Sequence, residues 1–188
     1  NSWGCPEIEG CNPDNWMFME TVINNLVAAG IVVVVSAGND GSQGCSSIDR
    51  PASMFESSFV VGASNQVDSV AHFSSYGPVT IDGSGRWKPD LVAPGVDVKS
   101  IVLDGFGTWS GTSMAGPHVA GAVALMLDAN PELKGRVEEI QNILKETAVP
   151  VKDPRACDGI VADQVPNFIA GHGRIDALAA VNAASTWT

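Results

Sequence analysis

The sequence has few basic residues, few aromatic residues and no long apolar run, and these scarcities exclude several classes of protein. Ten Lys and Arg stand against 21 Asp and Glu, which gives a formal net charge of -11. Domains that bind nucleic acid carry the opposite sign, so we expect no nucleic-acid partner. No stretch approaches the roughly 18 apolar residues of a membrane span, so we expect no membrane span. Hydrophobic residues make up 45% of the chain and charged ones 16%, which excludes a disordered chain or a coiled coil.

The sequence also lacks an initial Met, a signal-type segment and any C-x-x-C pair. It begins at Asn1, so we expect the natural amino end to be missing. The four cysteines are an even set without the spacing of a zinc or redox motif: Cys5, Cys11, Cys45 and Cys157. One or two structural disulfides are the favoured interpretation, and Cys5 with Cys11 would close a tight loop. Disulfides indicate an oxidising, secreted setting, whereas free buried thiols are the alternative.

Strand-like and helix-like segments alternate along the 188 residues, a length that suits a single domain. Apolar spacing and stop signals predict four helices, at residues 14–30, 113–128, 136–148 and 175–184. Runs of apolar and β-branched residues predict strands at 31–35, 59–61 and 96–102, the first of them buried on both faces. The order of these elements indicates an α/β layer fold with a mostly parallel sheet.

The helix predicted after Ser113 has an unusual composition, because residues 115–124 are small or apolar nearly all round. Such a helix is expected to be buried, with small residues that let backbones approach closely. Ser113 lies at its entrance, where free N–H groups and the positive end of the helix dipole gather. A hydroxyl there is either a plain N-cap, the commoner case for an isolated signal, or a nucleophile whose oxyanion product the same field stabilises.

Three short segments that contain glycine stand out along the chain. Residues 111–121 read Gly-Thr-Ser-Met-Ala-Gly-Pro-His-Val-Ala-Gly, residues 36–41 read Ser-Ala-Gly-Asn-Asp-Gly after a valine run, and residues 1–4 read Asn-Ser-Trp-Gly. These segments resemble the serine, asparagine and substrate-binding motifs of the subtilisin-like serine proteases, the subtilase family. The resemblance covers nearly the whole chain. It implies that residues 1–188 are the carboxy-terminal part of one catalytic domain, an incomplete three-layer subtilisin-like α/β fold.

The resemblance implies a serine endopeptidase that cleaves polypeptides through an acyl-enzyme. Ser113 would be the nucleophile, and Asn39 together with the backbone N–H of Ser113 would donate hydrogen bonds to the oxyanion. Fixed donors at that point favour the transition state selectively, because the negative charge on the carbonyl oxygen appears only there. Without the surrounding motifs, Asn39 in Asn-Asp-Gly would be interpreted as a turn residue.

The resemblance also implies which residues line the substrate cleft. A segment that binds the peptide as an added strand would comprise Ser2, Trp3 and Gly4. The opposite wall of the primary pocket would comprise Ser36, Ala37 and Gly38. Thr112, next to the nucleophile, is assigned to the same cleft. Asp49 falls at the floor of the pocket, where a carboxylate would favour a basic substrate side chain unless the adjacent Arg50 neutralises it.

A serine protease also needs a base that takes the serine proton and a carboxylate that orients the base. The family's Asp-[Ser/Thr]-Gly and His-Gly-Thr-His segments do not occur in the sequence. His118 is five residues after Ser113 on one helix, which turns it roughly 140° away. His72 and His172 are interpreted as ordinary polar residues. We therefore expect a missing amino-terminal half to supply the base and to pair with the open sheet edge, and we expect little or no hydrolysis without it.

Two alternatives use the same residues differently. A non-catalytic descendant would keep the fold as a binding or regulatory module, although such a module has no chemical need for Ser113 or Asn39. A different hydrolase class would use the same serine, but the G-x-S-x-G elbow of the α/β-hydrolases does not occur around it. We assign no cofactor and no metal ligand, since no D-x-[DN]-x-[DN]-G calcium loop occurs, and leave calcium in a longer parent open.

Overall fold

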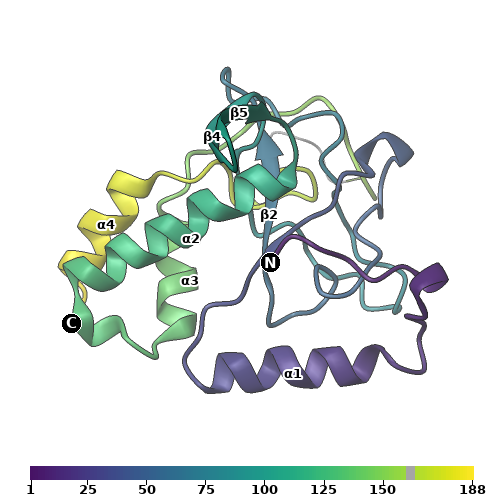
Figure 1. Cartoon of the computed structure of the whole chain (residues 1–188), viewed down its shortest axis with the longest axis horizontal. Coiled ribbons are helices and arrows are strands. Elements are labelled where there is room, and N and C mark those ends of the chain that lie inside the picture. Colours follow the sequence, from purple (N-terminus) through teal and green to yellow (C-terminus); the bar gives the residue numbers. More distant parts are fainter. Residues whose placement is uncertain (160–163) are drawn as a thin grey trace.

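The computed structural model describes residues 1–159 and 164–188. A three-stranded parallel sheet forms the centre of the molecule, and its middle strand is visible in Figure 1. The strands β1 (Val34–Ser36), β2 (Phe59–Ser64) and β3 (Leu91–Pro94) stand in chain order, and the register sets Val35 beside Val60. Every residue of β2 is buried. A central parallel strand is covered on both faces, which explains its apolar sequence.

Helices on both faces of the sheet give the molecule three layers. They are α1 (Trp16–Ala28), α2 (Thr112–Ala129), α3 (Val137–Glu146) and α4 (Ala177–Ser185). Successive strand residues point to opposite faces, so Val34 packs in the core beneath α2, α3 and α4. Val35 packs in a second core with Ile23 of α1. The predicted α/β layer fold with a mostly parallel sheet is confirmed.

A β-hairpin projects from this body beside the start of α2 (Figure 1). Its strands β4 (Val98–Val102) and β5 (Gly105–Trp109) pair antiparallel with each other, and most of their residues are exposed. The strand predicted at 96–102 therefore exists but does not belong to the central sheet. Three short 3-10 helices complete the assignment: η1 (Glu7–Glu9), η2 (Gly41–Gln43) and η3 (Pro131–Leu133).

Several predicted boundaries need correction. The strand predicted at 31–35 begins only at Val34, because β2 begins opposite that residue, and Ile31 is exposed. The helix predicted from residue 14 begins at Trp16, with Asn15 at the N-cap position and no side chain that caps it. Neither β3 nor β5 was expected, since each is a short run without the alternation that identifies a strand.

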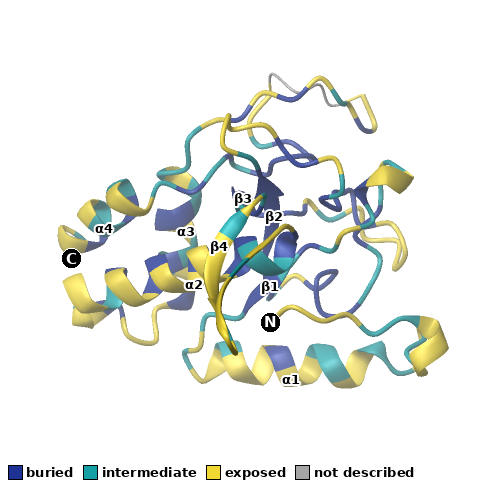
Figure 2. Cartoon of the chain, turned by 45° about the horizontal axis from the view of Figure 1, so that its top comes forward, coloured by how far each residue is buried: buried dark blue, intermediate teal, exposed yellow. Residues whose placement is uncertain are grey.

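Helix α2 is buried along one face only. Its inward side chains, which pack on the sheet and on α4, include Ala115, Val119, Ala122 and Met126. Its outward residues are exposed (Figure 2): Pro117, His118, Ala120, Gly121, Ala124 and Leu125. The prediction that this helix is buried holds for the inward face and is wrong for the outward face, because burial depends on a neighbour and none of the described elements covers the outward face.

The two edges of the sheet also differ. Segment 173–175 continues the sheet beyond β3, with two backbone hydrogen bonds to Val92 at 2.9 Å. The edge of β1 is met by Asn1, whose amino group donates to Val34 O at 2.8 Å and whose carbonyl accepts from Ser36 N at 3.0 Å. Within residues 1–159 and 164–188, no other backbone group pairs with this side of β1.

The cysteines form two disulfides, Cys5–Cys11 and Cys45–Cys157. The predicted Cys5–Cys11 pair is confirmed, and none of the four thiols is free. Among the described helices, none combines the length and apolar character that crossing a bilayer requires.

Candidate active site

Ser113 lies in the first turn of α2, one residue after the buried Thr112. The N-cap of this helix is Gly111, and no side chain caps it, so the interpretation of Ser113 as a plain N-cap is wrong. The Ser113 Oγ instead accepts a hydrogen bond from the hydroxyl of Ser2, 111 residues earlier in the chain. The serine predicted to act as nucleophile thus lies against the segment predicted to bind substrate, at the positive end of a helix dipole.

Asn39 follows β1 and faces the start of α2. Its Oδ1 accepts two hydrogen bonds from Thr112, one from the backbone N–H and one from the hydroxyl, both at 3.0 Å. The hydroxyl of Thr112 in turn accepts a bond from Gly38 N at 3.2 Å. Because both lone pairs of Oδ1 are occupied, the amide presents its other end, the Nδ2 donor, outward. Asn39 is exposed, so this donor is accessible to a bound carbonyl oxygen.

The end of β1 is held against α2 by its local sequence. Ser36 donates a hydrogen bond from its hydroxyl to Thr112 O at 3.0 Å. Gly38 has a φ of 108°, and a Cβ at this position would lie 2.9 Å from the hydroxyl of Ser75. That hydroxyl accepts a bond from Asp40 N at 2.9 Å. Glycine is therefore required for the turn that directs Asn39 toward Thr112.

Ser113 and Asn39 line one cavity of about 280 Å³, which we call the candidate cavity. All ten residues assigned from the sequence line it: Ser2, Trp3, Gly4, Ser36, Ala37, Gly38, Asn39, Asp49, Thr112 and Ser113. Four lining residues were not assigned: Asp40, Ser47, Arg50 and Ser53. Asp40 and Arg50 are chain neighbours of assigned residues, which is a usable signal, whereas nothing in the sequence distinguishes Ser47 or Ser53.

Two carboxylates of the candidate cavity share one guanidinium group. Arg50 lies 3.2 Å from Asp40 through Nη2 and 3.5 Å from Asp49 through Nε. Burial raises the pKa of Asp49; the Arg50 charge opposes this shift and the Asp40 charge adds to it. With both carboxylates ionised, one negative charge remains on this group, so Arg50 compensates the acidic side chains only in part.

The three histidines lie outside the candidate cavity. His118 Nδ1 is 2.9 Å from the carbonyl oxygen of Met114, one turn earlier on α2. His72 is exposed. His172 lines a different cavity, where burial and the Lys145 charge lower its pKa. In the part of the chain that the structure describes, no histidine forms a hydrogen bond with Ser113.

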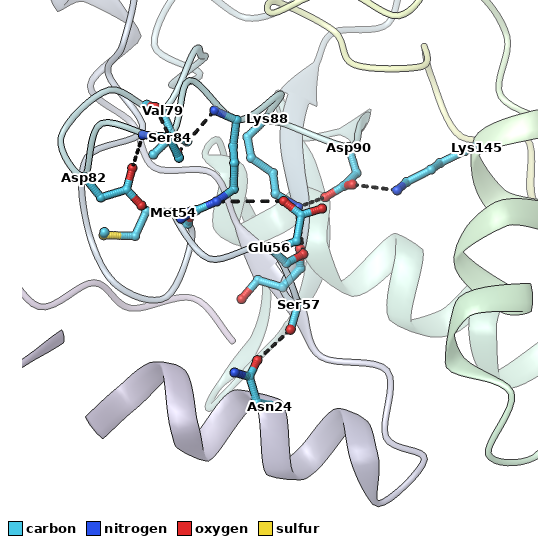
Figure 3. A network of polar contacts seen from close by, with 12 residues as sticks. Asn24, Met54, Glu56, Ser57, Val79, Asp82, Ser84, Lys88, Asp90 and Lys145 are labelled. Atoms are coloured by element: carbon cyan, nitrogen blue, oxygen red, sulfur yellow. Dashed lines mark hydrogen bonds and ion pairs between the residues drawn. The ribbon is translucent and has the colours of Figure 1, made fainter. Parts of the chain in front are cut away.

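A charge network centred on the buried Asp90 lies at the start of β2 and β3 (Figure 3). The carboxylate of Asp90 is 2.7 Å from Lys88 Nζ and 3.0 Å from Lys145 Nζ, and it accepts from Val60 N at 2.7 Å. Lys88 also donates to Ser58 O at 2.7 Å. Burial opposes ionisation of Asp90, but the two ammonium groups outweigh it, so its pKa lies below the usual value. The network ties the start of β3 to α3.

Comparison with known proteins identifies the family. Residues 1–173 match the model of the subtilase family, and the chain therefore belongs to that family of serine-type peptidases. Bacillopeptidase F of Bacillus subtilis (strain 168) is 38% identical over 191 residues, which cover 97% of this chain and 12% of that protein. Subtilisin of Bacillus pumilus is 41% identical over 114 residues, 60% of this chain and 38% of that protein.

Two further comparisons agree. Alkaline elastase YaB of Bacillus sp. (strain YaB) is 40% identical over 131 residues, 69% of this chain and 31% of that protein. The solved structure of the prenylagaramide maturation protease PagA superposes with a TM-score of 0.68 at 23% identity, over 88% of this chain and 55% of that one, and shows the shared fold. The chain spans 12% to 38% of the length of the three curated relatives.

Proposed function

We propose that this chain is the nucleophile-bearing part of a subtilisin-like serine endopeptidase that acts on polypeptides outside the cell. Ser113 Oγ attacks the scissile carbonyl carbon, and Asn39 Nδ2 with the Ser113 backbone N–H stabilises the resulting oxyanion. The observation that carries the proposal is the pair of hydrogen bonds from Thr112 to Asn39 Oδ1, which turns a donor outward beside the nucleophile. The two disulfides support the extracellular setting.

The substrate would lie as an extended strand along the rim of the candidate cavity. Ser2, Trp3 and Gly4 are exposed on this rim and offer their backbone to a peptide. Residues 36–38 would form the opposite wall of the primary pocket. Acyl transfer of this kind uses serine, a base and oxyanion donors, so we assign no cofactor to the described residues.

The base and its orienting carboxylate come, in this proposal, from an amino-terminal segment that carries the Asp and His motifs. Three open surfaces support such a partner: the edge of β1 beyond Asn1, the outward face of α2, and an apolar stripe on α1. The stripe consists of Phe18, Val22 and Leu26. An unpaired strand edge binds a further strand readily, and one added strand with helices on both faces would cover all three surfaces. Alone, residues 1–188 should hydrolyse little and should aggregate.

The direct test uses the full-length polypeptide that contains residues 1–188 and a chromogenic peptide substrate. Ser113→Ala should abolish hydrolysis. Asn39→Ala should lower kcat by about 10²–10³, with a small effect on KM, because its donor acts in the transition state. Asn142→Ala, an exposed residue of the same type on α3, is the matched control and should leave both constants unchanged. Undiminished hydrolysis by the Ser113→Ala protein would refute the proposal.

Asp49 should influence which substrate residue is preferred just before the cut bond. Because Asp40 and Asp49 share Arg50, the pocket keeps one negative charge and should favour Arg or Lys before the cut bond. We expect about a fivefold preference over Leu or Phe, the size of a solvent-accessible ion pair. Asp49→Asn should reduce it. Equal cleavage of the basic and apolar peptides by the unaltered protein would exclude this role.

The alternative is a non-catalytic subtilase-derived binding or regulatory module. One observation favours it, namely that within the described residues no histidine is hydrogen-bonded to Ser113. Such a protein would bind extended peptides at the candidate cavity without cleaving them, and its binding would survive the Ser113→Ala substitution.

A further inference from the structure

A second groove begins at Ser113 and leads away from the candidate cavity. Its volume is about 310 Å³, and Ser113 is the residue that lines both spaces in the described structure. The other walls come from β4 and from the first two turns of α2: Val98, Lys99, Ser100, Met114, Pro117 and His118. We call this space the hairpin groove, because the β4–β5 hairpin lies beside the start of α2 (Figure 2).

The two spaces on either side of Ser113 differ in charge. The candidate cavity contains two carboxylates, Asp40 and Asp49, and one guanidinium group. The hairpin groove is lined by Lys99, a basic residue, and no acidic residue is among the described residues that line it. The contrast is notable in a chain whose formal net charge is -11. A substrate that crosses Ser113 therefore passes from a negative pocket into a positive groove.

Lys99 is exposed on β4, and its ammonium lies 5.3 Å from the centre of the Phe106 ring. A cation–π contact of this kind orients the ammonium and leaves its N–H groups available. No described carboxylate lies within ion-pair distance of Lys99. The hairpin's own acids are placed elsewhere, since Asp97 accepts a bond from Ser110 at 3.3 Å and Asp104 lies at the turn between the strands.

We propose that Lys99 determines specificity on the leaving-group side by binding an acidic side chain of the substrate. This inference rests on the proposed function. Asn39 and residues 2–4 direct the acyl part of the peptide into the candidate cavity, so the part released as an amine extends into the hairpin groove. Asp or Glu at the first or second residue after the cut bond then meets the Lys99 ammonium. The preferred polypeptide is basic before the cut and acidic after it.

The test uses the full-length polypeptide and internally quenched peptides that differ only in carrying Glu, Gln or Lys at these two positions. We expect kcat/KM to be about fivefold higher for Glu than for Lys, the size of an exposed ion pair. Lys99→Glu should invert this order. Lys134→Glu, an exposed lysine that lines neither space, makes the same charge change and should preserve the order. A general effect of net charge would change both variants equally.

Measuring the same preference at different salt concentrations distinguishes an ionic contact with Lys99 from a packing effect. Raising the ionic strength from about 0.01 M to 1 M shortens the Debye length from about 30 Å to 3 Å, so the preference for Glu should shrink toward unity. Cleavage of all peptides with equal kcat/KM, or an unchanged order in Lys99→Glu, would overturn the inference alone. Cleavage of no peptide by the unaltered protein would overturn the proposed function, and this inference with it.

Discussion

The two edges of the central sheet differ in how far the chain covers them. At the closed side, which comprises β3, α3, α4 and the Asp90 network, segment 173–175 continues the sheet and Leu144 is fully buried. At the open side, which comprises the edge of β1 and the outward faces of α1 and α2, Phe18 is 70% exposed and Leu26 37% exposed. The more apolar of the two helices, α1, therefore keeps large apolar side chains exposed, while α3, which has more charged residues, buries its apolar face. The difference shows that, within the described residues, the chain's own elements cover the closed side and leave apolar side chains exposed on the open side.

The largest expected effect concerns the disulfide that joins the loop after η2 to the closed side. Cys45–Cys157 spans 112 residues, whereas Cys5–Cys11 at the open side spans 6. A disulfide restricts the unfolded chain more when it closes a longer loop. Replacing Cys45 and Cys157 by serine should therefore lower the free energy of unfolding by about 5 kcal/mol, and replacing Cys5 and Cys11 should lower it by about 2 kcal/mol. Denaturant unfolding of the full-length polypeptide measures both. Equal losses would contradict the loop-length argument.

A pair of leucine substitutions compares the two sides directly. Leu144→Ala removes a buried side chain of α3 and should cost about 2–5 kcal/mol. Leu26→Ala on α1 should cost a similar amount in the full-length polypeptide if a partner covers the stripe, although the described structure alone would predict less than about 1 kcal/mol. A small loss at Leu26, measured by the same unfolding experiment, would show that the open side stays open.

A smaller effect is expected at Asp90 on the closed side, where the free energy of unfolding should depend on pH. The folded pKa of Asp90 lies below its unfolded value because of Lys88 and Lys145. Its contribution is therefore fully present above the unfolded pKa of about 3.9 and is lost as the pH falls through the folded pKa. Asp90→Asn should flatten the loss of stability in acid, whereas Asp128→Asn, on the exposed face of α2, should not. Identical pH profiles for both variants would argue against the network.

Local motifs predicted more of the site than of the fold around it. The residues that the subtilase resemblance assigned to the cleft line one cavity, and the motifs that carry this resemblance each lie within a few positions of the sequence. The open face of α2 was predicted wrongly, since burial depends on residues far along the chain. The pairing of Cys45 with Cys157 was not predicted, because four cysteines allow three pairings. The sharing of Arg50 by two carboxylates likewise depends on the folded loop.

The measurement that tests the central claim most directly is to locate an organophosphonate adduct by mass spectrometry, in the full-length polypeptide and in residues 1–188 alone. The account predicts a single adduct on Ser113 in the folded full-length polypeptide, no adduct when that polypeptide is denatured before the reagent is added, and little labelling of residues 1–188, in whose described part no histidine is hydrogen-bonded to Ser113. An adduct on another residue, or an unlabelled Ser113 in a folded full-length polypeptide, would contradict the assignment of Ser113 as the nucleophile.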